Sequence, residues 1–189
     1  PSASFAEQAV LFQPVVSVYT DGEGQGLLQP EGVACTENTL VVADTGNNRL
    51  LQYTVKVDAV EFASQIKMTQ LTNPIRVQIN SQGEIFALDG KNRRIVRLKK
   101  DGQFAGNLDL KGVPPDTGAT IVPRSFKIDQ QDNIFIVDSD NHRIQKFNSN
   151  QEFIETWGSI GSGEGQFLSP SGIAVDSVGN VFVADTNNN

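Results

Sequence analysis

Three aspartates are each followed, five positions later, by an arginine, and such a charged pair invites a catalytic interpretation. The pairs are Asp44 with Arg49, Asp89 with Arg94 and Asp138 with Arg143, and a fourth aspartate of the same series is Asp185. An active site occurs once in a molecule, whereas this pair recurs along the chain. We therefore predict a structural role, in which the aspartate accepts hydrogen bonds from the following turn and the arginine pairs with it across a hairpin.

Other residues with chemical potential lack the surroundings that their chemistry needs. The glycine-rich stretches Gly22–Gln25 and Gly163–Gln166 have no following Lys-Ser/Thr and no helix, so they do not predict a phosphate site. Asp138–Asn141 resembles the start of a calcium loop but lacks the required Gly and Glu. His142, the only histidine, is predicted to be a solvated turn residue. We predict no catalytic residue, no metal ligand and no cofactor.

The aspartates mark an internal repeat. A proline precedes each of them by 14 or 15 residues: Pro30, Pro74, Pro123 and Pro170. The spacing from one aspartate to the next is 45, 49 and 47 residues, and a longer loop at Lys111–Thr120 explains the widest spacing. Repeats of this length predict a modular fold whose units bury their cores against one another.

Each unit reads as four short strands, of which the second is apolar on both faces, as in Ile134–Val137. Such a strand must lie between two layers, while the more charged third and fourth strands lie nearer solvent. Small sheets of this kind stack around an axis, so we predict an all-β propeller of antiparallel four-stranded blades. The expected strands are Gly32–Thr36, Thr39–Asp44, Asn48–Val55 and Ala59–Ile66 in the first unit, Ile75–Asn80, Glu84–Asp89, Arg93–Lys99 and Gln103–Leu108 in the second, Ser125–Asp129, Asn133–Asp138, His142–Asn148 and Glu152–Trp157 in the third, and two short strands in the fourth.

The chain is expected to begin with an arm over residues 1–13 and to continue as a propeller over 14–189. The blade repeats fall near 22–67, 68–110, 120–157 and 163–189, and Pro14–Thr20 is predicted to be the outer strand of an earlier unit. This gives fifteen strands and about four blades, the last one incomplete. Closed propellers have about four to eight blades. We therefore expect a fragment of a longer ring, or a ring completed by another chain.

Segments such as GEGQFLSPSGIAVDSVGNVFVADTNNN and VADTGNNRLLQY resemble NHL repeats. The resemblance implies a propeller that usually has six blades, and it is weakest in the second copy, where Arg76 and Gly90 replace the Gly and Thr of other copies. Related propellers include metal-dependent peptide-amidating lyases, lactonases have a similar architecture, and some NHL propellers bind RNA. The resemblance specifies a fold and no reaction.

Composition restricts the partners. The net charge is -7, from 15 basic and 22 acidic residues, which disfavours nucleic acid as a partner. No apolar run is long enough to span a membrane. Cys35, the only cysteine, lies in an apolar run and is predicted to be a buried, inert thiol. Ser4-Phe5-Ala6 resembles the end of a secretory leader; if it is one, the protein works outside the cytoplasm.

Function is expected on the face formed by the turns between second and third strands and by the links between blades. Irregular residues gather there: Arg76, Lys91, Asn92, Arg93, Arg124, Asp140, Asn141 and His142. Irregular side chains on a regular scaffold suit recognition. The leading hypothesis is a non-enzymatic scaffold that binds another protein or a small ligand. The alternatives are a metal-dependent lyase- or lactonase-like enzyme, with its ligands in further blades, and an RNA-binding propeller.

Overall fold

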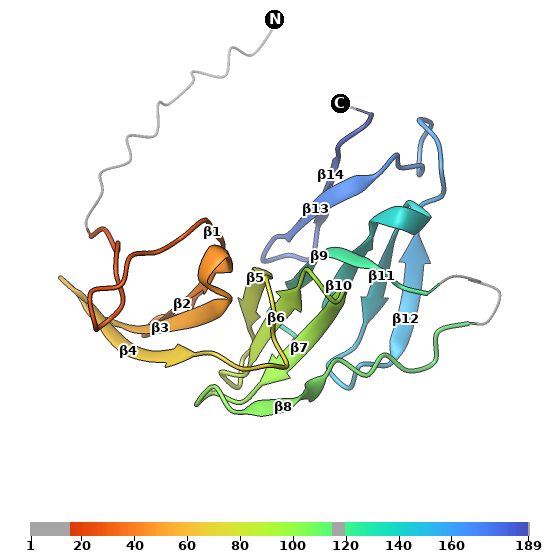
Figure 1. The fold of residues 1–189 in the computed structure, drawn as a ribbon. Helices are drawn as coiled ribbons and strands as arrows, with labels where there is room; N and C mark the ends of the chain where they lie inside the picture. The colour runs from red at the N-terminus through yellow and green to blue at the C-terminus, as the bar shows by residue number, and fades with distance from the viewer. Residues whose placement is uncertain (1–15, 115–119, 189) are drawn as a thin grey trace, which may run out of the picture.

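The computed structural model describes residues 16–114 and 120–188, which form three four-stranded antiparallel sheets and one two-stranded hairpin (Figure 1). In each sheet the strands follow one another in chain order. We call the sheets blades 1 to 4. Their strands are β1 (Pro30–Cys35), β2 (Thr39–Asp44), β3 (Arg49–Val55) and β4 (Val60–Ile66); β5 (Pro74–Ile79), β6 (Ile85–Asp89), β7 (Arg94–Leu98) and β8 (Phe104–Asn107); β9 (Pro123–Ile128), β10 (Ile134–Asp138), β11 (Arg143–Phe147) and β12 (Phe153–Trp157); and β13 (Pro170–Val175) and β14 (Val181–Asp185).

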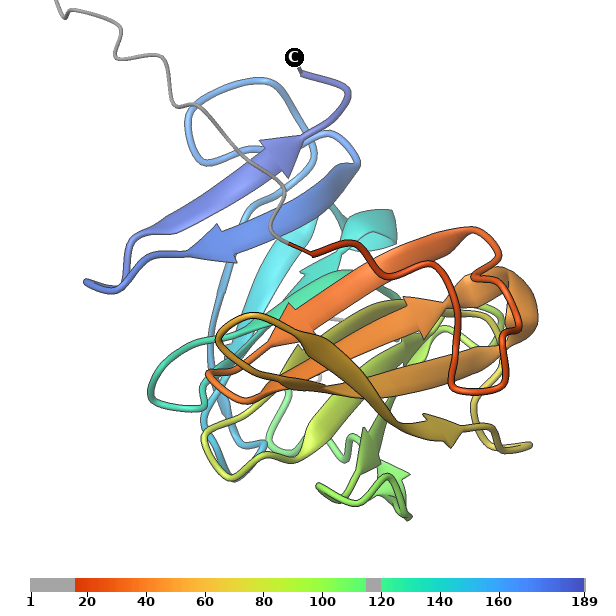
Figure 2. The same ribbon diagram turned by 90° about the vertical axis from the view of Figure 1, so that its left-hand side faces the viewer.

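The blades stand side by side in an arc that does not close into a ring (Figures 1 and 2). The first strand of each blade contacts the first strand of the next, from β1 through β5 and β9 to β13, so these strands lie nearest the axis. At Gly32 a Cβ atom would come within 2.9 Å of the Arg76 Cα, which shows how closely β1 and β5 approach. The predicted propeller architecture is confirmed.

The cores lie between neighbouring blades, as the sequence predicts for strands that are apolar on both faces. One core joins blades 1 and 2 and includes Val41, Leu50 and Val96. A second joins blades 2 and 3 and includes Phe86 and Phe147. Every residue of β6 and β10 is buried, because each strand has a blade on both sides.

The strand predicted at Pro14–Thr20 is wrong for the part that the structure describes. Residues 16–19 lie in no strand, and Thr20 makes only an isolated bridge with Gly26. The outer strand of a blade forms by pairing with the third strand of the same blade. The described residues contain no third strand of an earlier blade with which residues 16–20 could pair. The segment instead covers the free face of blade 1, where Val18 and Leu27 pack beside Tyr53.

Two predictions of burial are also wrong. Cys35 is exposed, because it shares one face of β1 with the 63% exposed Val33, while Ala34 on the opposite face packs into the core with blade 2. The second strand of blade 4 is not enclosed either, since Phe182 is 58% exposed. Both positions lie on faces that no other blade among the described residues covers.

The long loop predicted at Lys111–Thr120 lies partly outside the described residues, as does the arm at residues 1–13. In the described part, the Lys111 N–H donates to the Gln151 carbonyl at 2.8 Å, and the Lys111 carbonyl accepts from the Phe153 N–H at 2.8 Å. These bonds hold the beginning of the loop against the outer strand of blade 3.

Candidate functional site

The turn between second and third strands has the same form in blades 1 and 3. A single 3-10 turn, η1 (Thr45–Asn47) or η3 (Ser139–Asn141), ends at a residue with left-handed backbone angles. These residues are Asn48 and His142, with φ of 54° and 53°, and Arg93 has φ of 51° at the same place in blade 2. Asn and His are among the non-glycine residues that adopt this conformation most readily.

The aspartate before each turn holds the chain that leads into its blade. In blade 1 the Asp44 carboxylate accepts hydrogen bonds from the Leu28 N–H at 2.7 Å, the Asn47 side chain at 2.8 Å and the Arg49 Nε at 2.7 Å. Blades 3 and 4 repeat the link contact, with Val122 on Asp138 and Leu168 on Asp185. The carboxylates therefore fasten the links between blades to the turns.

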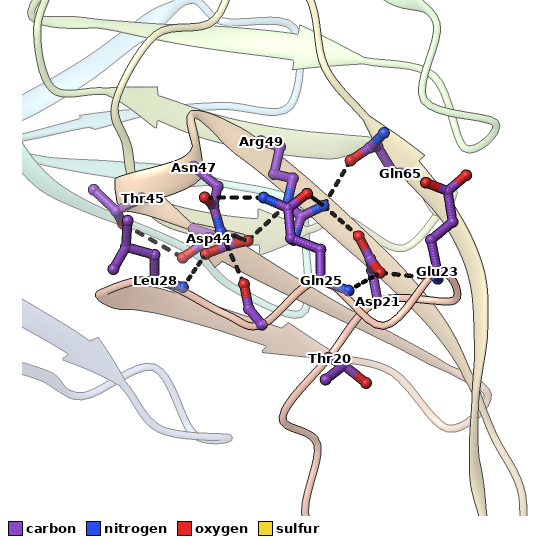
Figure 3. Close-up of polar contacts among 12 residues, drawn as sticks. Thr20, Asp21, Glu23, Gln25, Leu28, Asp44, Thr45, Asn47, Arg49 and Gln65 are labelled. Atoms are coloured by element: carbon purple, nitrogen blue, oxygen red, sulfur yellow. Dashed lines mark hydrogen bonds and ion pairs between the residues drawn. The ribbon is translucent and has the colours of Figure 1, made fainter.

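Arg49 is the centre of the most extensive of these networks (Figure 3). Its guanidinium is 1% exposed and pairs with Asp44 at 2.7 Å and with Asp21 at 2.5 Å, and it also donates to Gln65 at 2.7 Å. Burial lowers the pKa of Arg49, but the hydrogen bonds and charges of the two aspartates outweigh burial and raise it. Burial likewise raises the pKa of Asp21, and bonds from Arg49 and two backbone N–H groups more than reverse that effect.

The other two predicted ion pairs differ in the distance between the arginine and the aspartate. Arg143 lies 2.8 Å from Asp138 and its side chain is 9% exposed. Arg94 lies 3.4 Å from Asp89, is 38% exposed, and donates instead to the Gln70 carbonyl at 2.8 Å. All three arginines thus bind groups of their own blade or its incoming link, and their structural role stays a prediction that unfolding experiments can test.

A hollow of about 410 Å³ lies where the first strands of blades 2, 3 and 4 begin. We call it the axial hollow. Each first strand carries a β-bulge directly after its proline, and the bulged residues are Glu31, Ile75, Arg124 and Ser171. A bulge redirects a side chain. The last three of these residues line the axial hollow.

The charged residues of the axial hollow are Arg93, Arg124 and Asp140. Arg93 and Asp140 form an ion pair at 3.4 Å, but their side chains are 66% and 62% exposed. Arg124 is exposed, and its guanidinium makes no hydrogen bond or ion pair within residues 16–114 and 120–188. Hydroxyl groups of Ser139, Ser169 and Thr186 complete the polar lining.

Three of the eight residues predicted for the binding face therefore meet in the axial hollow, and five do not line it. Arg76 donates to the carbonyls of Glu31 and Ile75, between blades 1 and 2. Asn92 and Asn141 bind the aspartates of their own turns. Lys91 is exposed and precedes Asn92 in the turn of blade 2. Sequence reasoning missed Ile75 and Ser171, although their place directly after the repeated prolines is a signal that could have identified them.

His142 is the turn residue that was predicted, but it is less exposed to solvent than expected. It is half-buried, and its Nδ1 accepts a hydrogen bond from the Ser169 N–H at 3.0 Å. The Asn48 side chain accepts the equivalent bond from the Asn73 N–H at 2.9 Å. The left-handed turn residue thus joins one blade to the chain entering the next, which accounts for the burial of His142.

Within the described part of the chain, no three side chains among His, Cys, Asp and Glu are grouped so that they could share a metal ion. None of the helices in residues 16–114 and 120–188 has the length and apolar character needed to cross a bilayer.

Comparison with known proteins identifies the repeat. The NHL repeat profile matches residues 120–147 and 167–189, which contain the turns of blades 3 and 4. NHL repeat-containing protein 3 of Homo sapiens is 31% identical over 102 residues. The chain contains NHL repeats. Protein brain tumor of Drosophila melanogaster is 27% identical over 122 residues, covering 61% of this chain.

This NHL-repeat chain spans only part of its relatives. The human match covers 48% of this chain and 29% of NHL repeat-containing protein 3, and the fly match covers 11% of protein brain tumor. Among solved structures, a streptogramin B lyase has a TM-score of 0.59 at 16% identity, over 85% of this chain and 49% of the lyase. A chain in a nidogen/laminin complex has a TM-score of 0.60 at 19% identity, over 80% and 54% of the two chains. At these identities the likeness shows the propeller fold alone.

Proposed function

We propose that this NHL-repeat chain is a non-enzymatic recognition module that binds an acidic segment of a partner protein at the axial hollow. The observation that carries the proposal is that the repeated charged residues and the irregular ones have different contacts. The repeated aspartates and arginines bind their own blades, whereas the irregular Arg93 and Arg124 reach the axial hollow with exposed guanidinium groups.

The charge of the axial hollow favours an anionic partner. Its lining holds two arginines and one aspartate, in a chain whose net charge is -7. A guanidinium binds a carboxylate with two parallel hydrogen bonds, and the hydroxyls of Ser139 and Ser171 can donate further ones. The Arg93–Asp140 pair is solvent-exposed and therefore contributes little free energy. A carboxylate of the partner can replace Asp140 on Arg93 at low cost.

The fold supports binding of a protein. The nidogen/laminin neighbour was solved as a complex of two proteins, so a blade arrangement of this shape occurs in a protein that assembles with another. An acidic protein segment also fits a hollow that is open to the solvent and formed by short turns, because side chains on such a scaffold are held in place by the blades.

A peptide titration tests the proposal. A labelled, glutamate-rich peptide is expected to bind the chain, and its glutamine counterpart is not. Reversing both charges, by Arg93→Glu with Arg124→Glu, is expected to weaken binding at least about tenfold, because charge-assisted hydrogen bonds are lost. Fluorescence anisotropy at low and moderate salt measures both.

The matched control is Lys99→Glu with Lys100→Glu, which makes the same charge change at two exposed positions in the turn after β7, on the opposite side of blade 2. It is expected to leave the affinity within about twofold, the effect of a distant screened charge. Equal losses in the two variants would mean that the peptide responds only to net charge. Binding of the glutamine peptide with equal affinity would contradict the proposal.

A further inference from the structure

The junction between blades 1 and 2 contains a groove that is nearly closed at the junction between blades 2 and 3. Both junctions lie between four-stranded blades. The groove between blades 1 and 2 measures about 380 Å³, whereas the equivalent hollow between blades 2 and 3 measures about 60 Å³. We call the larger one the inter-blade groove. It lies between the Thr36–Thr39 turn and the end of β3 on blade 1 and the Asn80–Gly83 turn on blade 2.

The turns between first and second strands differ at the two junctions. The turn of blade 1, Thr36–Thr39, is one residue shorter than that of blade 2, Asn80–Glu84, although the same backbone bond closes both. Between blades 2 and 3 the turns are tied together, because the Asp132 carboxylate accepts bonds from the Ser81 N–H at 2.9 Å and the Ser81 hydroxyl at 2.6 Å. Gly83 occupies the place of Asp132 in blade 2. Without a side chain, it cannot tie the turns of blades 1 and 2 together in this way.

The third strands differ as well, three residues after the repeated arginine. Blade 2 has Arg97 at this position, a long side chain that lines the smaller hollow and lies 3.8 Å from Glu84. Blade 1 has Gln52, which is 9% exposed. The Gln52 Nε2 donates to the Lys100 carbonyl of blade 2 at 3.2 Å, and its Oε1 accepts from the Ser64 hydroxyl at 2.9 Å. The shorter amide thus joins the two blades without filling the inter-blade groove.

The polar lining of the inter-blade groove is available to a ligand. Four uncharged side chains of the lining make no hydrogen bond within residues 16–114 and 120–188: Asn38, Thr39, Thr54 and Gln82. The charged residues of the lining, Glu37 and Lys100, have opposite signs. An ionised ligand group would lose hydration there without gaining a net opposite charge, which is costly. The inter-blade groove therefore favours an uncharged ligand.

The inter-blade groove has the length of a short extended peptide. It crosses all four strands of blade 1, from Thr36 beside β1, past Thr39 and Thr54, to Ala63 of β4. Neighbouring strands lie about 4.8 Å apart, so this crossing takes about 14 Å. An extended chain advances about 3.3 Å per residue, so about four residues fill that length. Amide side chains such as that of Gln82 offer both a donor and an acceptor, which match the N–H and C=O of a peptide group.

We infer that the inter-blade groove binds an extended, uncharged segment of about four residues from a partner protein. The peptide groups of this segment bond to the amides of Asn38 and Gln82 and to the hydroxyls of Thr39 and Thr54, beside the apolar side chain of Ile85. The inter-blade groove and the axial hollow lie at opposite ends of the strands of blade 2. The two sites are therefore separate, and neither depends on the ligand proposed for the other.

A capped tetrapeptide of threonine, asparagine, serine and glutamine is the probe, and NMR of the backbone amides of the chain is the measurement. The peptide is expected to shift the amide signals of Thr39 and Thr54. Gln52→Arg with Gly83→Asp introduces the residues that fill the other junction, and is expected to weaken binding at least about tenfold. The matched control is Gln70→Arg with Gly179→Asp. It makes the same two changes at an exposed link residue and at the equivalent turn glycine of blade 4, and should leave the affinity within about twofold.

Thr54→Val keeps the test valid if the double variant does not fold, because Thr54 is exposed and valine has a similar shape. Loss of the hydroxyl is expected to weaken binding about fivefold. Capped tetrapeptides of glutamate or of lysine should bind the inter-blade groove at least about tenfold more weakly than the neutral peptide. Equal shifts from the charged peptides, or no shift of the groove amides by the neutral one, would overturn the inference. So would maltose, if it shifted these amides when the peptide did not, because the site would then suit a carbohydrate.

Discussion

Blade 3 and the hairpin of blade 4 carry nearly the same second strand in different surroundings. β10 reads IFIVD and is buried at every position, whereas β14 reads VFVAD and has no fully buried residue. Both pair with a first strand through the same bulge after a proline. The local turns and the proline therefore determine the hairpin, while burial of its side chains depends on strands and blades added around it.

The difference shows that one NHL unit does not contain its own core. Phe135 stacks on Trp157 of its own blade and lies in a strand that also contacts blade 4, and Ile136 packs in the core that blades 2 and 3 share. Stability in such a fold is expected to be a sum of repeat and interface terms. Substitutions at equivalent positions in the two blades should therefore have different costs.

The largest difference in lost stability is expected between Phe135 and Phe182, which occupy equivalent positions in blades 3 and 4. Phe135→Ala leaves a cavity in a packed interior and should lower the free energy of unfolding by about 3 to 5 kcal/mol. Phe182→Ala removes a side chain that is 58% exposed, and its effect should stay below about 1 kcal/mol. Chemical denaturation measures both. Similar losses for the two variants would show that blade 4 is enclosed in solution.

The paired aspartates should give a smaller contrast. Asp138→Ala leaves turn donors without a partner, about 1 to 3 kcal/mol. It also removes the charge-assisted bond between this carboxylate and the 9% exposed Arg143, so the expected loss exceeds that of Asp185→Ala. Asp185→Ala removes only the bonds to Leu168 and Asn188, and should cost about 1 to 3 kcal/mol.

Denaturation of Asp138→Asn serves as the control, because the amide keeps the shape of the side chain and one acceptor oxygen. A loss for Asp138→Ala no greater than that for Asp185→Ala would contradict the contribution assigned to the buried arginine.

The sequence predicts the elements of this fold well because their signals are local. Repeated prolines, aspartates and turn residues locate the twelve described strands of blades 1 to 3 to within about two residues. The errors arise where a prediction depends on an absent neighbour. Cys35 and Phe182 have the composition of buried positions, and they are exposed on faces that no blade within residues 16–114 and 120–188 covers. In the described part of the predicted strand Pro14–Thr20, residues 16–19 lie in no strand.

The candidate site was predicted in part. The turn residues Arg93, Arg124 and Asp140 stood out because they break the repeat, and they do line the axial hollow. The inward position of Ser171 depends on a one-residue bulge. Such a shift in register leaves no apolar pattern in the sequence. His142 also breaks the repeat, but its partner is a backbone N–H of the next blade, which side-chain composition cannot indicate.

A still smaller loss of stability is expected when the hydrogen bond between His142 and the chain entering blade 4 is removed. His142→Ala removes the acceptor for the Ser169 N–H and should cost about 1 kcal/mol. His142→Asn should restore the stability, because Asn48 accepts the same bond between blades 1 and 2. Thermal unfolding measures the cost, and faster hydrogen exchange at Ser169 locates it. Equal losses for both variants would contradict the role of the side-chain acceptor.

The smallest change in stability is expected for a substitution in the link that leads into blade 1, which differs from the link into blade 4. The link into blade 1 carries Asp21 on the buried Arg49, whereas the link into blade 4 has Ser162 at the matching position. Asp21→Asn keeps the shape and one acceptor oxygen, so the loss at neutral pH should be modest. Its pH dependence is the informative quantity.

The pKa of Asp21 is held below its ordinary value of 3.8, since the bonds from Arg49, Gln25 and Glu23 outweigh the opposing effect of burial. A carboxylate with a lowered pKa stabilises the folded chain above the unfolded pKa, and this contribution is lost as the pH falls through the folded value. The melting temperatures of wild type and Asp21→Asn should therefore differ most near neutral pH and converge in acid. Glu23→Gln, in the same link and exposed, is the matched control. A constant difference between wild type and Asp21→Asn at every pH would mean that shape, and not charge, holds the link to Arg49.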